Sequence, residues 1–344
     1  MFKSTLNALG SLMLTLPAMG VLVLAVLVSY NEPDAHIAWL VVPLTLLAFN
    51  LLAAILANPR FRRQGGLLVF HLGLLLVIVL VALGRLTFLE GRFEIAEDQS
   101  FDPDLVEVER RGPWHPWTLD EISFVQAEIE VDYAPGLRRG HTRSTVRIAT
   151  VAGMPERSTV GDDSPLIAGS YRFYTTSNKG FAVVLTWLGG DGTSRTGAIH
   201  LPSYPLLDWK QVNTWISPGG QEIEVDMILP DARPEHSTWT LNSAEIENVA
   251  LAVRFDNQST VLSTGERVSV SGGRLRFDDV RMWMGYRITY DPTLPWLFAA
   301  ALVAVLGLGW HFWGNLWSRP LPVEYGGIEN VARGDVEASS IARG

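Results

Sequence analysis

The chain contains no cysteine in 344 residues. This absence excludes disulfide bonds, thiolate nucleophiles, cysteine-ligated zinc and thiol relays. Any part of the chain that lies outside the cytoplasm must therefore be stable without a disulfide cross-link.

Positive charge is also scarce, because 27 Lys and Arg residues face 36 Asp and Glu residues, for a net charge of −9. Nucleic-acid binding depends on Lys and Arg that neutralise phosphates, so this balance argues against it. The chain has no Gly-x-Ser-x-Gly elbow, no phosphate-binding glycine loop and no His-Glu-x-x-His pair. Adjacent acids such as Asp162-Asp163 and Asp278-Asp279 indicate solvated turns, since neighbours in a strand point to opposite faces. We expect no catalytic residues, and an accessory subunit rather than an autonomous enzyme.

Four long apolar runs stand out, at residues 12–30, 37–57, 66–84 and 294–313. Each has the roughly 20 residues needed to cross a bilayer core about 30 Å thick. The sequence predicts a membrane protein with three transmembrane helices in residues 1–84 and a fourth after a long polar segment. We expect the first run to be a retained helix, because no small-x-small cleavage site follows Val28.

Basic residues set the expected orientation. The loop between the second and third runs carries Arg60, Arg62 and Arg63, whereas the first loop carries Glu32 and Asp34. Positive loops stay in the cytoplasm. We expect a multi-pass protein of a bacterial inner membrane with both termini in the cytoplasm. Residues 85–293 would then be extracytoplasmic (periplasmic), and the polar tail 314–344 would be cytoplasmic and disordered.

Residues 85–293 contain alternating stretches rich in Val, Ile, Thr, Tyr and Phe, separated by glycine-rich turns such as Gly189–Gly192 and Gly272-Gly273. This pattern predicts a mostly antiparallel β domain, either a sandwich or a partly open barrel. The stretches are Ala127–Tyr133, Thr145–Val151, Tyr171–Thr176, Ala182–Trp187, Glu222–Ile228, Val249–Phe255, Arg267–Val270, Arg274–Phe277 and Met282–Tyr290.

His71 is an ionisable ring inside the otherwise apolar run 66–84. Polar residues within a membrane segment are functional hypotheses by default. A neutral imidazole suits haem iron, so His71 is a candidate axial ligand, about 8 Å inside the cytoplasmic edge. The alternative is a histidine whose ring nitrogens only bond a neighbouring helix.

His311 lies near the cytoplasmic end of the fourth run, at a depth similar to that of His71. A bis-histidine haem site within one chain is therefore conceivable. The alternative is a headgroup-level residue among Trp310, Trp313 and Trp317, an aromatic belt. The other histidines lack the spacing of a zinc site; they are His36, His115, His141, His200 and His236. His115 is the one that lies among aromatic residues, and we expect it in a surface loop.

Three parts of the chain carry motifs in a set order. The first is Trp39–Ala57, which leads to the basic loop Pro59–Arg63. The second is Phe70–Leu76, followed by a short strand in Gly91–Asp98. The third is Gly285–Pro295, with an Asp-Pro step before the last helix. Together these parts resemble the ResB family, also called CcsB, of system II cytochrome c maturation.

The resemblance implies a partner of the CcsA type, a multi-helical membrane protein. It implies that the pair moves haem across the membrane and supports its attachment to apocytochrome c. It also implies that His71 is the haem-iron ligand of this subunit, with haem b bound transiently opposite a histidine of the partner, and it leaves His311 unmatched. Two other hypotheses stay open: a structural subunit without haem, and a small b-type electron-transfer cytochrome that uses His71 and His311.

Overall fold

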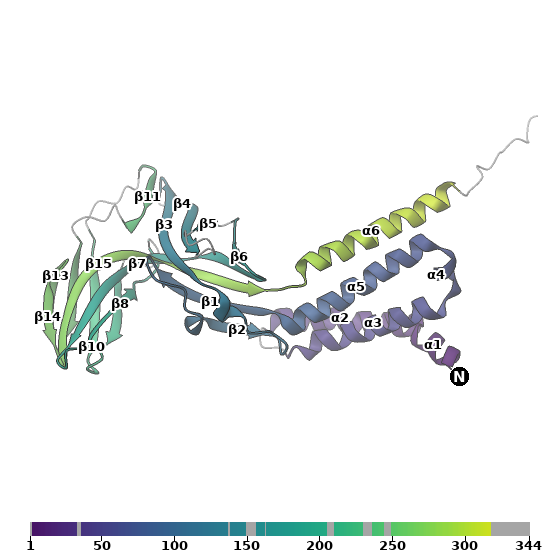
Figure 1. Cartoon of the computed structure of the whole chain (residues 1–344), viewed down its shortest axis with the longest axis horizontal. Helices are drawn as coiled ribbons and strands as arrows, with labels where there is room; N and C mark the ends of the chain where they lie inside the picture. The colour runs from purple at the N-terminus through teal and green to yellow at the C-terminus, as the bar shows by residue number, and fades with distance from the viewer. Residues whose placement is uncertain are drawn as a thin grey trace, which may run out of the picture. The chain divides into compact units, whose positions relative to one another are not determined.

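The computed structural model describes residues 2–32, 36–136, 138–148, 156–161, 163–204, 210–229, 236–243 and 249–317. The chain forms two compact units. One consists of helices from the two ends of the chain. The other, residues 81–294 with the short piece 34–41, is mostly β-sheet. Figure 1 labels most of the elements of both units.

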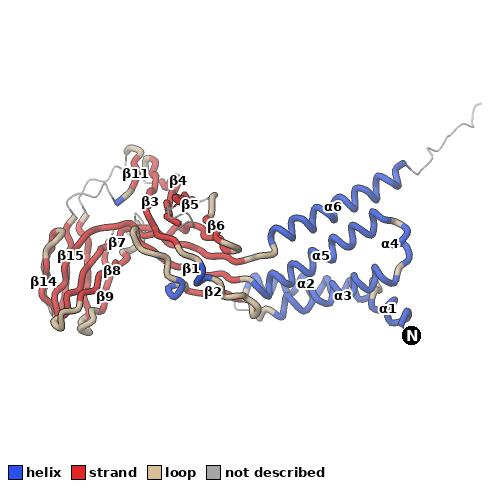
Figure 2. The backbone as a smooth tube through the Cα atoms, in the orientation of Figure 1, coloured by secondary structure: helices blue, strands red, loops and turns tan. Residues whose placement is uncertain are grey.

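Within the described residues, four helical segments are long and apolar enough to cross a membrane: Thr5–Asn31, Ala38–Ala57, Gly65–Thr87 and Leu294–Gly314. Three precede the β-rich segment and one follows it, which confirms the predicted arrangement (Figure 2). The helices are α1 (Phe2–Leu9), α2 (Leu12–Asn31), α3 (Ala38–Ala57), α4 (Pro59–Arg63), α5 (Gly65–Thr87) and α6 (Leu294–Trp317). The predicted disordered tail lies outside the described residues beyond residue 317, so it stays a prediction.

The first apolar segment is broken at Gly10, between α1 and α2. Asn50 of α3 bridges the two helices on either side of this break. Its amide nitrogen donates to the Leu9 carbonyl of α1 at 2.5 Å, and its amide oxygen accepts from Thr15 Oγ1 of α2 at 2.7 Å. A Cβ on Gly10 would lie 2.6 Å from the Ala54 backbone nitrogen, so glycine is required here. The Asn50 amide thus satisfies the Leu9 backbone carbonyl, which lipid cannot do.

α5 and α6 approach each other through glycines. A Cβ on Gly66 would lie 2.5 Å from the backbone nitrogen of His311, and one on Gly307 would lie 2.5 Å from that of Phe70. A third glycine, Gly73, packs against α6 in the same way. Small residues at these positions let the two backbones pack closely where lipid supplies no hydrophobic driving force.

The β unit contains three sheets, and every strand pair in them is antiparallel. A seven-stranded sheet has the order β2-β1-β15-β7-β6, with β14 beside β15 and β8 beside β7. Two four-stranded sheets have the orders β13-β12-β10-β9 and β11-β3-β4-β5. The predicted antiparallel β domain is confirmed. The strands are β1 (Leu89–Ala96), β2 (Glu107–Arg111), β3 (Phe124–Ala134), β4 (Arg138–Ile148), β5 (Glu156–Gly161), β6 (Leu166–Ala168), β7 (Tyr171–Gly189), β8 (Ser194–His200), β9 (Val212–Ile216), β10 (Glu222–Ile228), β11 (Trp239–Leu241), β12 (Ala250–Phe255), β13 (Gln258–Ser263), β14 (Arg267–Val270) and β15 (Gly273–Tyr290).

The two longest strands, β7 and β15, each join stretches that the sequence predicts as separate strands. Their pairing shifts register twice, near Asp278 and at Gly285. An extra residue in one strand reverses the faces of the side chains and so interrupts the alternation. The expected turn at Asp278-Asp279 is wrong, because both residues lie in β15; Asp278 accepts a bond from Thr186 of β7. Of the other acid pair, Asp162 lies outside the described residues.

Tyr286 joins two sheets inside the core. Its ring stacks on Phe93 at 5.2 Å, and its hydroxyl bonds Gln126 Oε1 at 2.8 Å and Ser144 Oγ at 2.6 Å. Gln126 and Ser144 belong to β3 and β4, and all three polar side chains are buried. Burial raises the pKa of Tyr286, so its hydroxyl stays protonated and able to donate.

Candidate functional site

His71 lies in the second turn of α5, in a helix that begins with two glycines and continues with apolar side chains. Its Nδ1 lies 2.8 Å from the Leu67 carbonyl oxygen, one helical turn earlier. A carbonyl only accepts, so this contact assigns the ring proton to Nδ1. Nε2 has no hydrogen-bond partner among the described residues. Nε2 is therefore the ring nitrogen left available to bind a metal.

Two aromatic rings fix the plane of His71. Phe61 of α4 meets it edge-on at 4.6 Å between ring centroids, and Phe70 does so at 4.9 Å. Phe61 is itself buried, so the short helix α4 positions one side of the imidazole. Leu74, one turn further along the same side of α5, is 37% exposed. The half-buried imidazole therefore stands at the edge of an apolar surface.

The structure does not bring His71 and His311 together. Gly66, Phe70 and Gly73 mark the line of α5 that faces α6. At about 100° per residue, His71 lies about 130° around the helix from that line. His311 packs beside Gly66, about 7.5 Å along the axis from His71 at 1.5 Å per residue. A second ligand for a metal on His71 must therefore come from elsewhere than His311.

This arrangement suits one axial ligand of a haem. A metal-binding histidine usually donates its other N–H to a carbonyl or carboxylate, which fixes the tautomer and raises ligand basicity. Leu67 does this for His71. The described residues contain no group of three or more His, Asp or Glu side chains able to hold a bare metal ion. A single imidazole on an apolar surface is a donor of the kind that can ligate haem iron.

His115 lies in a loop, as expected, but its ring is half-buried rather than solvated. Nδ1 bonds the Thr87 carbonyl at 2.8 Å, Nε2 bonds the Tyr171 hydroxyl at 3.0 Å, and the ring meets Tyr290 edge-on at 4.6 Å. Burial lowers the pKa of His115; the Thr87 bond opposes this shift, and nearby Arg111 adds to it. His115 therefore links Thr87, the last residue of α5, to Tyr290, the last residue of β15.

His200 is a histidine that the sequence pattern did not single out. Its Nδ1 lies 3.0 Å from Glu94 Oε2, and its ring stacks on Trp283 with an interplanar angle of 3°. Glu94 and His200 are 106 positions apart, so their pairing has no local sequence signal. Alternation along β1 places Glu90, Arg92 and Glu94 on one face. This pattern could have identified Glu94 as part of a charged surface, but not His200 as its partner.

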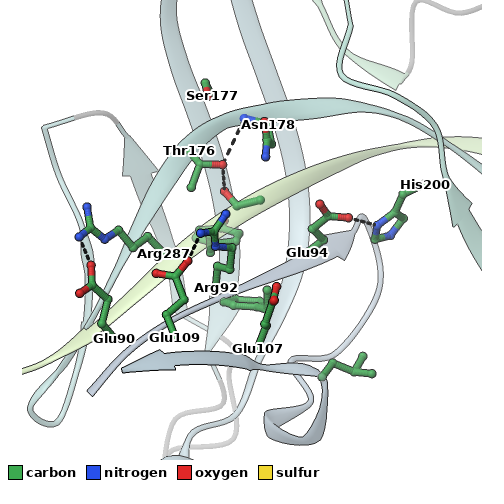
Figure 3. Close-up of a pocket in the computed structure, with 14 residues that line it drawn as sticks. Glu90, Arg92, Glu94, Glu107, Glu109, Thr176, Ser177, Asn178, His200 and Arg287 are labelled. Carbon is green, nitrogen blue, oxygen red and sulfur yellow. Dashed lines mark hydrogen bonds and ion pairs between the residues drawn. The ribbon is translucent and has the colours of Figure 1, made fainter. Parts of the chain in front are cut away.

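Glu94 and His200 lie at one end of a groove of about 750 Å³. Figure 3 shows their side chains turned toward each other, with the other charged residues on β1, β2 and β15. Four glutamates and two arginines line the groove, which gives a net charge of −2 when His200 is neutral. The charged lining residues are Glu90, Arg92, Glu94, Glu107, Glu109, His200 and Arg287.

The sequence profile of the ResB-like family matches residues 54–319, most of the chain. The chain belongs to the ResB-like family. That family is the ResB/CcsB family of cytochrome c biogenesis, so membership assigns this membrane protein to cytochrome c biogenesis. No curated protein matches the chain.

Among solved structures, the chain is similar to a "Cytochrome c Heme Lyase CcmF", with 13% sequence identity and a TM-score of 0.28. The match covers 88% of this chain and 35% of that one, so this chain spans about a third of that protein's length. A TM-score this low does not establish a shared fold.

Proposed function

We propose that this chain is a haem-handling accessory subunit of cytochrome c biogenesis and that His71 is its ligand to haem iron. The proposal is supported by family membership and above all by His71 itself, whose Nδ1 is held by the Leu67 carbonyl while Nε2 is free. Haem b is the cargo, held transiently, and apocytochrome c is its final acceptor.

The residues of this chain hold and orient the ligand. The Leu67 carbonyl accepts from Nδ1–H, which leaves Nε2 as the nitrogen that can bind a metal. Phe61 and Phe70 restrict rotation of the ring. Haem supplies the iron that this nitrogen binds, and the porphyrin suits the apolar surface beside Leu74. Because His311 lies elsewhere on the helix pair, we assign the opposite ligand to a CcsA-type membrane partner.

We also propose the placement of the chain in a bacterial inner membrane. The arginines of α4 support a cytoplasmic location for the segment between α3 and α5, and hence for both termini. The β unit would then be extracytoplasmic, where the partner and the apocytochrome meet. Extracytoplasmic domains are often stabilised by disulfide bonds, which a chain without cysteine cannot form. The buried aromatic core and the cross-sheet hydrogen bonds of the β unit stabilise it without them.

The test is haem content in the purified complex. The chain is co-expressed with its membrane partner, and bound haem is measured by pyridine haemochrome and Soret absorbance. We expect His71→Ala to remove most of the b-type haem and to lower holocytochrome c in the same cells. Imidazole added to the His71→Ala complex should restore Soret absorbance, because it replaces the lost ligand without replacing the side chain.

His311→Ala is the matched control, since it removes a histidine at the cytoplasmic end of the other helix of the pair. We expect normal haem content from this variant. Equal loss of haem in both variants, with haem retained by the isolated subunit, would support the b-type cytochrome instead. Normal haem and normal holocytochrome c in His71→Ala would refute the assignment of His71.

A further inference from the structure

β2 is an edge strand of the seven-stranded sheet. Among the strands that the structure describes, it pairs with β1 alone, through residues Glu107 to Arg111. All five of its residues are exposed. An edge strand presents backbone N–H and C=O groups that can pair with another extended chain. β2 is short and charged, which limits indiscriminate pairing.

The groove described above lies along this strand. Glu107 and Glu109 alternate on β2 and line the groove, whereas Val108 between them does not. Glu109 pairs with Arg92, and Glu90 accepts bonds from Arg110 and Arg287. Glu107 has no ion-pair partner within the described part of the chain. Its carboxylate is therefore the acidic group still available to a cation in the groove (Figure 3).

Exposed apolar side chains surround the same edge. Leu105 before β2 is 67% exposed, Trp114 after it is 63% exposed, and Val108 is 39% exposed. An extended chain added beside β2 alternates its side chains with the same period of two. Basic side chains would then lie over Glu107 and Glu109, and apolar ones would lie beside Val108.

We propose that the β2 edge and its groove bind an extended polypeptide segment in which basic and apolar residues alternate. Backbone pairing with β2 supplies affinity, and the net negative groove selects positively charged side chains. Selection by charge follows because the groove carries twice as many glutamates as arginines. This interaction does not depend on His71 or on haem.

The probe is a peptide of alternating Lys and Val, about eight residues long so that it extends beyond β2. Its binding to the full chain in nanodiscs of uncharged lipid is measured by fluorescence anisotropy. We expect saturable binding that weakens with salt. We expect Glu107→Lys to weaken it about fivefold, since an exposed attraction becomes a repulsion. Glu222→Lys makes the same charge change at an exposed position of β10 and should leave binding unchanged.

A second peptide, of alternating Lys and Pro, separates backbone pairing from charge. It carries the same charge, but proline lacks the N–H that sheet extension requires. We expect it to bind about tenfold more weakly, and we expect only the Lys-Val peptide to slow amide hydrogen exchange in β2. The proposal would be overturned if the two peptides bound equally well, or if Glu107→Lys did not change binding of the Lys-Val peptide. It would also be overturned if a small polyamine displaced the Lys-Val peptide as effectively as unlabelled Lys-Val peptide does.

Discussion

Replacing Tyr286 with phenylalanine should destabilise the β unit by about 2 kcal/mol. The ring and its stacking on Phe93 are kept, and only the hydroxyl is lost. That loss leaves Gln126 Oε1 without the donor Tyr286 and Ser144 Oγ without one of its two partners, in a place where neither side chain reaches solvent. Leaving a buried polar group unsatisfied costs about 1–3 kcal/mol. Gln126 still donates to Ser144 at 2.7 Å, which keeps the cost below two full penalties.

For a unit of this size, each kcal/mol lowers the melting temperature by about 2–4 °C. Tyr286→Phe should therefore melt about 4–8 °C below the wild type. The assay is thermal unfolding of the full chain in detergent, followed by circular dichroism at a wavelength dominated by β structure. A double-mutant cycle with Ser144→Ala should give a coupling energy of about 1 kcal/mol, because the two side chains are in direct contact.

Tyr174→Phe on β7 is the matched control. Tyr174 is half-buried, and its hydroxyl has no hydrogen bond among the described residues. We expect this variant to unfold within about 0.5 kcal/mol of the wild type. Equal melting temperatures for Tyr286→Phe and Tyr174→Phe would show that the buried network does not stabilise the contact between the sheets.

The class of the fold could be predicted from the sequence because membrane helices and antiparallel strands each have a local sequence pattern, a long apolar run and an alternation of apolar and polar residues. About 20 apolar residues in a row specify a spanning helix whatever surrounds them. The length of β7 and β15 could not be predicted in this way. Their pairing continues through the register shifts at Asp278 and Gly285, and only contacts across the sheet show that the strand goes on.

In the candidate site, too, the features set by local sequence could be predicted, whereas those set by tertiary contacts could not. His71 was identifiable because an imidazole in an apolar helix needs a partner, and that is a property of one residue in its own segment. The direction in which it points could not be predicted, because the close approach of α5 and α6 depends on glycines more than 200 positions apart. The same holds for the pairing of Glu94 with His200, which tertiary structure alone brings together.

Two further changes test the packing and the electrostatics. Gly307→Leu places a side chain 2.5 Å from the Phe70 backbone nitrogen, so we expect a shorter thermal half-life in detergent; Gly309→Leu, where the space is open, should leave it unchanged. Burial raises the pKa of the Glu97 carboxyl above 4.5, although the backbone N–H groups of Met282 and Ile129 oppose the shift. The folded state therefore binds this proton more tightly than the unfolded state. Its stabilising effect is full below about pH 4.5 and is lost as pH rises through the folded pKa. Denaturant unfolding between pH 4 and 8 should show that Glu97→Gln flattens this decline, and parallel curves for the two proteins would contradict the assignment.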